Sequence, residues 1–81
     1  MRKDDARVAK AFAGVLRERR LGAGLTQEAL AHEAGLERTY ISFLERGLRQ
    51  PSLRVLMALS AALKVAPSEM VKQLESSLKA K

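Results

Sequence analysis

The sequence contains no cysteine and no tryptophan, and it has only two prolines, one tyrosine and one histidine. Without cysteine the chain has no disulfide framework, no thiol nucleophile and no cysteine-based metal centre. A single histidine also falls short of an ordinary zinc site, which takes four ligands. No apolar run approaches the roughly 20 residues of a membrane span, and the charged first residues lack a signal-peptide core. We therefore expect a cytoplasmic protein with no metal, cofactor or membrane partner.

The residues that are abundant indicate a helical domain. Alanine and leucine supply 26 of the 38 hydrophobic residues, whereas valine and isoleucine together supply six. Alanine and leucine favour helices and β-branched residues favour strands, so we predict an all-α protein. The 81 residues suit one domain, expected over 1–81. The net charge of +6 suggests an anionic partner such as nucleic acid.

Glycine, proline and hydrophobic spacing divide the chain into five predicted helices. They cover about residues 5–21, 27–34, 37–46, 53–63 and 67–78. Thr26 and Ser52 are expected N-caps, and Gly35 and Gly47 are expected to end the second and third helices. In the fourth predicted helix, the leucines at 53, 56, 59 and 63 are expected to form one apolar side.

The two short helices over about residues 26–46 have the spacing of a helix-turn-helix. Ala31 is small enough to let the two helices cross closely, and Gly35 allows the positive φ that a tight turn needs. Ile41 and Leu44 fill the angle between the helices. This pattern predicts a second helix held rigidly against the first.

The same segment resembles the phage-repressor-type (Cro/repressor-like, XRE) family of helix-turn-helix transcription regulators. The matching words are Leu-Thr-Gln-Glu-Ala-Leu-Ala at 25–31, Arg-Thr-Tyr-Ile-Ser at 38–42, Glu-Arg-Gly at 45–47 and Pro-Ser-Leu at 51–53. The resemblance implies a five-helix repressor-like fold and a transcription regulator that binds a (pseudo)palindromic double-stranded DNA operator as a homodimer. The stretch at 38–42 also resembles the controller proteins of restriction–modification systems.

Helical phasing of the third predicted helix supports DNA recognition. At about 100° per residue, Arg38, Thr39 and Ser42 share one face, whereas Ile41 and Leu44 lie opposite. Arginine can bond guanine O6 and N7 together, and serine or threonine can reach several bases. We therefore predict base contacts by Arg38, Thr39 and Ser42, although an ordinary solvated helix face would have the same composition.

Further residues are expected to hold the DNA backbone, which positions a protein without reading sequence. Arg46 and Arg54 flank the end of the recognition helix, and the Tyr40 hydroxyl can reach a phosphate. The family resemblance implies that Gln27 binds a phosphate and that Arg49 contacts DNA, which makes Arg49 our second choice for a base contact.

Phe43 interrupts the polar face of the third predicted helix. Its ring can pack on a thymine methyl group, or it can be covered by the segment 47–51 or by a dimer partner. We favour the covered arrangement.

Three further arginines, Arg17, Arg19 and Arg20, form a second basic cluster. A solvated face, or an ion pair with Glu18 or Glu45, explains them as well as DNA contact does. No DNA contact is assigned to them.

The fifth predicted helix is our candidate dimer interface. A small domain needs only some of its apolar residues for the core, and the remainder can meet a symmetry mate. The alternative is that all of those on this helix belong to the core. These residues are Met70, Val71, Leu74 and Leu78.

Two other classes of function compete with the regulator. An antitoxin-like module that binds a protein partner and its own operator would carry a partner-binding tail, and the residues after 74 are too few to be persuasive. Catalysis is not expected, because no serine, histidine and carboxylate are arranged to activate a nucleophile. We also expect no small-molecule ligand, so that regulation follows protein concentration, through the protein's own promoter and a restriction–modification operon.

Overall fold

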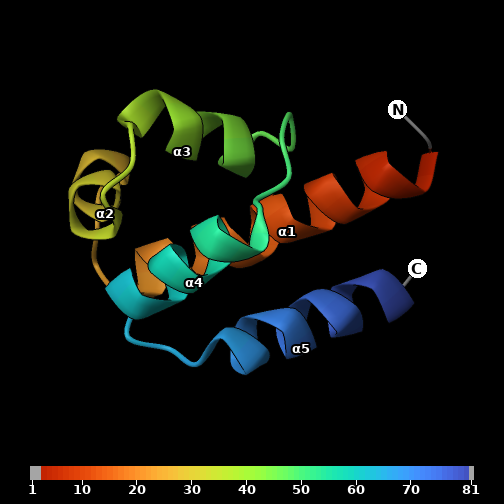
Figure 1. The fold of residues 1–81 in the computed structure, drawn as a ribbon. Helices are drawn as coiled ribbons and strands as arrows, with labels where there is room; N and C mark the ends of the chain where they lie inside the picture. The colour runs from red at the N-terminus through yellow and green to blue at the C-terminus, as the bar shows by residue number, and fades with distance from the viewer. Residues whose placement is uncertain (1–2, 81) are drawn as a thin grey trace.

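The computed structural model describes residues 3–80, which form five helices (Figure 1). They are α1 Lys3–Gly22, α2 Gln27–Ala34, α3 Arg38–Glu45, α4 Leu53–Ala62 and α5 Pro67–Lys79. The predicted all-α class is confirmed, and each expected helix is present within two residues of its expected bounds. None of the helices in this part of the chain is long and apolar enough to cross a membrane.

The predicted capping residues begin two of the helices. Thr26 accepts a hydrogen bond from the Ala29 N–H at 3.0 Å, and Ser52 accepts one from the Val55 N–H at 3.1 Å. Each side chain thereby satisfies a donor that the first turn of a helix leaves unpaired. Pro67 stands in the first turn of α5, where its missing N–H costs nothing.

Helix α1 lies through the middle of the molecule, with α3 on one side and α5 on the other (Figure 1). Helix α2 packs against α3 and α4, and α4 returns across the molecule to meet α5. The start of α1 and the end of α5 lie at the same end of the molecule, where Arg7 Nη2 donates to the Leu78 carbonyl at 2.9 Å. This arrangement leaves the outer sides of α3 and α5 facing opposite directions.

The core is built where all five helices of the described chain converge. Its fully buried side chains include Leu16, Leu30, Ile41, Leu59 and Met70. Met70, which was predicted for a dimer interface, is fully buried among the core residues of its own chain, and its part in an interface stays a prediction.

The apolar side predicted for α4 is wrong at one residue. Leu59 is fully buried and Leu56 and Leu63 are half-buried, but Leu53 is 80% exposed. Leu53 lies about 60° around the helix from Leu56, which is enough to place it beyond the edge of the buried side.

Candidate nucleic-acid interface

The turn between α2 and α3 has a well-defined hydrogen-bonded geometry. Gly35 adopts the left-handed conformation at φ 70°, and the Leu36 N–H donates to the Ala31 carbonyl at 2.8 Å. A residue with a side chain is strained at this φ, so glycine suits the position. Ala31 is buried at the crossing of the helices. The turn therefore holds α3 in one orientation across α2, as the spacing predicted.

Helix α3 presents a polar face to solvent and an apolar face to the core. Arg38 and Thr39 are exposed and Ser42 is half-buried, whereas Ile41 and Leu44 are completely buried. The helical phasing expected for these five residues is thus present. The exposed face carries the donors that direct major-groove readout requires.

The segment from α3 to the first turn of α4 is strongly cationic at its surface. Arg46, Arg49 and Arg54 are exposed like Arg38, and Glu45 is the only acidic residue between positions 38 and 54. The Glu45 side chain is turned inward and is 4% exposed. Four arginines therefore stand on this surface without an exposed carboxylate from the same segment.

Glu45 is held by an arginine of α1. Arg20 Nε donates to Glu45 Oε2 at 2.6 Å, and Arg20 Nη2 donates to Glu45 Oε1 at 3.0 Å. Arg20 Nη1 also donates to the Leu25 carbonyl at 2.8 Å. The hydrogen bonds to Glu45 raise the pKa of Arg20 above its ordinary value, against the opposing effect of burial. This bidentate pair joins α1 to the end of α3.

Gln27 completes this cluster from the start of α2. Its Nε2 donates to Glu45 Oε1 at 3.1 Å, and the primary amide has a second N–H to offer. The first turn of α2 also carries backbone N–H groups without partners inside the helix, a favourable place for a phosphate. We call Arg20, Glu45 and Gln27 the α3-side triad. Sequence reasoning considered the Arg20–Glu45 pair but missed its link to Gln27.

Phe43 and Tyr40 occupy the margins of the polar face. Tyr40 is half-buried and packs against the core. Phe43 is also half-buried, and the Arg49 guanidinium carbon lies 5.5 Å from its ring centroid. The segment after α3 thus covers part of the ring, in agreement with the arrangement favoured from sequence.

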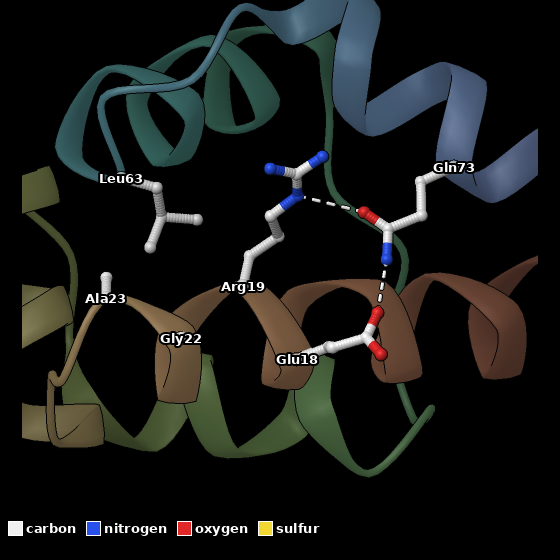
Figure 2. Close-up of a pocket in the computed structure, with 6 residues that line it drawn as sticks. All are labelled: Glu18, Arg19, Gly22, Ala23, Leu63 and Gln73. Carbon is white, nitrogen blue, oxygen red and sulfur yellow. Dashed lines mark hydrogen bonds between the residues drawn. The ribbon is translucent and has the colours of Figure 1, made fainter.

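A hollow of about 500 Å³ lies on another side of α1 and is shown in Figure 2. Arg19 Nε donates to Gln73 Oε1 at 2.9 Å, and Gln73 Nε2 donates to Glu18 Oε1. We call Arg19, Gln73 and Glu18 the α5-side triad. Because these polar groups bond one another across the α1–α5 contact, we interpret them as a structural link between the two helices.

The fold, the tight turn and the exposed cationic face together define a DNA-binding helix-turn-helix protein. A family model described as helix-turn-helix matches residues 16–70. The chain belongs to this family of transcription regulators, as the sequence pattern indicated.

Its curated relatives are named as control or regulatory proteins. The control protein C.BamHI of Bacillus amyloliquefaciens is 43% identical over 61 residues, which are 74% of this chain and 75% of the relative. An uncharacterized HTH-type transcriptional regulator of Sinorhizobium fredii, y4dJ, is 42% identical over 60 residues, 74% of this chain and 73% of the relative.

Solved structures agree with this assignment. The restriction–modification controller protein C.AhdI of Aeromonas hydrophila matches with a TM-score of 0.74 and 42% identity, covering 76% of this chain and 94% of that chain. The controller protein C.Esp1396I, solved as a tetramer in complex with its natural 35 base-pair operator, matches with a TM-score of 0.80 and 31% identity over 88% of this chain and 93% of that chain.

Proposed function

We propose that this regulator acts in the cytoplasm as a homodimer that reads a (pseudo)palindromic operator through α3. The observation that carries the proposal is the exposed face of α3, where Arg38 and Thr39 are accessible while the opposite face is buried. In this proposal Arg38, Thr39, Ser42 and Arg49 contact bases, and Gln27, Tyr40, Arg46 and Arg54 contact phosphates. The protein has no catalytic role.

Binding-site selection from a random duplex library tests this proposal and yields the operator. Arg38→Ala is expected to weaken binding to the selected operator by about 1–3 kcal/mol and to relax discrimination at one base pair. Binding to random duplex should change much less. Arg17→Ala is a matched control, because Arg17 is an exposed cation of α1 outside the proposed interface. Equal losses on both duplexes for Arg38→Ala would contradict base readout.

The dimer is supported by the position of exposed apolar side chains relative to α3. Two recognition helices must enter half-sites roughly 34 Å apart on one face of the duplex. The chain measures 31 × 23 × 21 Å, and α5 lies across α1 from α3 (Figure 1). A two-fold axis through the outer side of α5 would turn the recognition helices away from each other. The interface therefore fits better on the side where α4 meets α5.

Three large apolar side chains of α4 and α5 are exposed, Leu53, Met57 and Val71, and we call them the apolar edge. They are 80%, 56% and 47% exposed, respectively. An apolar pocket of about 130 Å³ shares Val71 with this edge and is also lined by Leu56, Met70 and Leu74. Exposed apolar side chains next to such a pocket can make a surface that complements itself across a two-fold axis. Each leucine that is fully buried in this way contributes roughly 1.5–3 kcal/mol, and the symmetry doubles the contribution.

This edge revises the residues proposed for dimerisation. Val71 and Leu74 remain in the proposed interface, now together with Leu53 and Met57. Leu78 lies farther from this edge, since it is half-buried near the other end of α5, where its carbonyl accepts a hydrogen bond from Arg7. Leu53 and Met57 were not proposed for dimerisation from the sequence, although their spacing of four residues places them on one side of α4.

Sedimentation of Leu53→Glu tests the interface. We expect this variant to be monomeric and to lose more affinity for the two-half-site operator than for a single half-site. Leu21→Glu is the matched control, because Leu21 is 57% exposed at the end of α1 and outside the edge. A Leu53→Glu protein that still dimerises would contradict this interface without affecting the proposed base contacts.

We further propose that the protein controls a restriction–modification operon and its own promoter. The support is its similarity to C.BamHI and C.AhdI, at 43% and 42% identity. The genes beside its own test the idea, since an adjacent endonuclease and methyltransferase are expected. The selected operator should then occur upstream of these genes.

A further inference from the structure

We propose that Phe43 is a positioning residue that holds Arg49 in place for base readout at the end of α3. The inference rests on the proposed DNA-reading function and adds a part to it that neither the family pattern nor the relatives' names assign. It begins from the placement of the Arg49 guanidinium carbon 5.5 Å from the Phe43 ring centroid. A cation within about 6 Å of a ring centroid is attracted by the negative face of the ring.

The ring is in the right place to present an arginine to the groove. Phe43 follows Thr39 by one helical turn, so the two side chains neighbour each other on α3. Thr39 is exposed on the proposed reading face, and Phe43 is half-buried at its margin. An arginine held over this ring therefore extends the reading face beyond the last turn of α3.

The backbone between the two residues is also constrained. The Leu48 N–H donates to the Phe43 carbonyl at 3.0 Å. Gly47 has φ +71°, and a Cβ built there would lie 3.2 Å from Lys10 Cγ and 3.3 Å from Lys10 Cα. The chain thus leaves α3 through a left-handed residue packed closely against α1. This packing restrains Gly47, where the segment that leads to Arg49 begins.

Stacking benefits recognition because an exposed arginine otherwise has many rotamers to lose when it binds. The guanidinium N–H groups lie in the plane of the group. When a guanidinium lies flat on a ring, these N–H groups stay free at its edge, where they can donate to guanine O6 and N7. Phe43 then acts through Arg49 and does not itself need to touch DNA.

The alternative for Phe43 is a direct contact with a thymine methyl group. The two roles differ in their dependence on Arg49. A ring that only positions Arg49 has no effect on binding once Arg49 is removed, whereas a ring that contacts thymine acts with or without it.

A double-mutant cycle on the selected operator duplex separates these roles. Phe43→Leu is expected to weaken binding about two- to fivefold, the usual size of an exposed cation–π contact. In an Arg49→Ala background it should have no further effect, and Phe43→Tyr should retain wild-type binding. The matched cycle with Arg46→Ala should be additive, because Arg46 is a neighbouring exposed cation that lies outside this contact.

A measurement on the free protein tests the Phe43–Arg49 contact separately from the proposed base contact of Arg49. The Arg49 side-chain protons should show an upfield ring-current shift in the NMR spectrum that Phe43→Leu removes and Phe43→Tyr keeps. Absence of this shift in a folded wild-type protein would overturn the inference. Additive losses of affinity in the Phe43–Arg49 cycle would also overturn it. If the loss caused by Phe43→Leu then disappeared on an operator with uracil in place of thymine, Phe43 would be assigned to a thymine methyl contact. Unchanged operator binding by Arg49→Ala would instead overturn the proposed base contact of Arg49.

Discussion

Two hydrogen-bonded triads of the same composition, each with one arginine, one glutamate and one glutamine, lie on two sides of α1. The α3-side triad joins Arg20 to Glu45 and Gln27, and the α5-side triad joins Arg19 to Gln73 and Glu18. The two arginines are consecutive in the sequence. Because successive residues of a helix point about 100° apart, they reach different neighbours.

The triads differ in burial and in the order of their members. In the α3-side triad the arginine and glutamate pair directly, with side chains 10% and 4% exposed. In the α5-side triad a glutamine stands between arginine and glutamate, and Glu18 is exposed. Breaking a buried pair strands a charge in a poorly solvated place, whereas water compensates for the loss of an exposed contact. Composition therefore does not predict which triad the fold depends on.

The largest expected effect comes from removing the carboxylate of the α3-side triad. Glu45→Ala leaves Arg20 buried without its counter-ion, so the free energy of unfolding should fall by about 3–5 kcal/mol in urea denaturation. Glu18→Ala, the matching change in the α5-side triad, should cost less than about 1 kcal/mol. Similar losses of unfolding free energy in the two variants would contradict the idea that the fold depends more on the α3-side triad.

An apolar replacement separates the stranded charge from the loss of packing. The pair of substitutions Arg20→Met and Glu45→Leu should recover most of the stability lost in Glu45→Ala, because no buried charge remains. A double variant as unstable as the single one would mean that packing of the two long side chains carries the effect.

Replacing the arginine of each triad by lysine tests whether the two triads contribute differently to stability as pH rises. Since the folded pKa of Arg20 is raised, its contribution to stability is lost only as pH rises through that high value, well above pH 10. Arg20→Lys should cost about 1–3 kcal/mol at pH 7, because one ammonium cannot replace the forked donors. Its remaining contribution should decline above about pH 10.4, the ordinary pKa of lysine. Urea denaturation at pH 7, 9 and 11 checks this, and Arg19→Lys should show no such added alkaline loss.

The glutamines of the two triads should differ in DNA binding. Gln27→Ala removes a proposed phosphate donor and should weaken binding to operator and random duplex alike, by about 1.5 kcal/mol or roughly tenfold. Gln73→Ala changes the same residue type in the α5-side triad and should leave both affinities unchanged. Fluorescence anisotropy with both duplexes measures this. A loss confined to the operator would assign Gln27 to base readout.

The smallest effect is expected from the arginine of the α5-side triad. Arg19→Ala removes its hydrogen bond to Gln73, and should lower the free energy of unfolding by less than about 1 kcal/mol. Operator binding should stay at the wild-type level. A marked loss of affinity would show that the α1–α5 contact controls the position of α3.

Much of the fold was predictable because helices are specified locally. The apolar repeat, the caps at Thr26 and Ser52 and the glycine at position 35 act over three to five residues. The polar and apolar faces of α3 were predictable for the same reason, since a regular helix converts spacing into direction.

The errors fall where a residue's environment depends on distant parts of the chain. Periodicity identified an apolar group on α5, but not that Met70 is enclosed while Val71 remains exposed. It also placed Leu53 on the buried side of α4, although α4 has no neighbour covering that residue. Such outcomes depend on the crossing of helices, which residue spacing within one helix does not specify.

By itself, the sequence determined the five helices, the helix-turn-helix and the residues on the exposed polar face of α3. Only the tertiary structure decided which arginine of an adjacent pair is buried, that Glu45 is withdrawn from the cationic surface, and that Arg49 lies over Phe43. The physical reason is the distance along the chain over which each kind of interaction acts. Helix formation and phasing depend on neighbours within a turn or two, whereas burial, ion pairing and stacking depend on which helices the folded chain brings together.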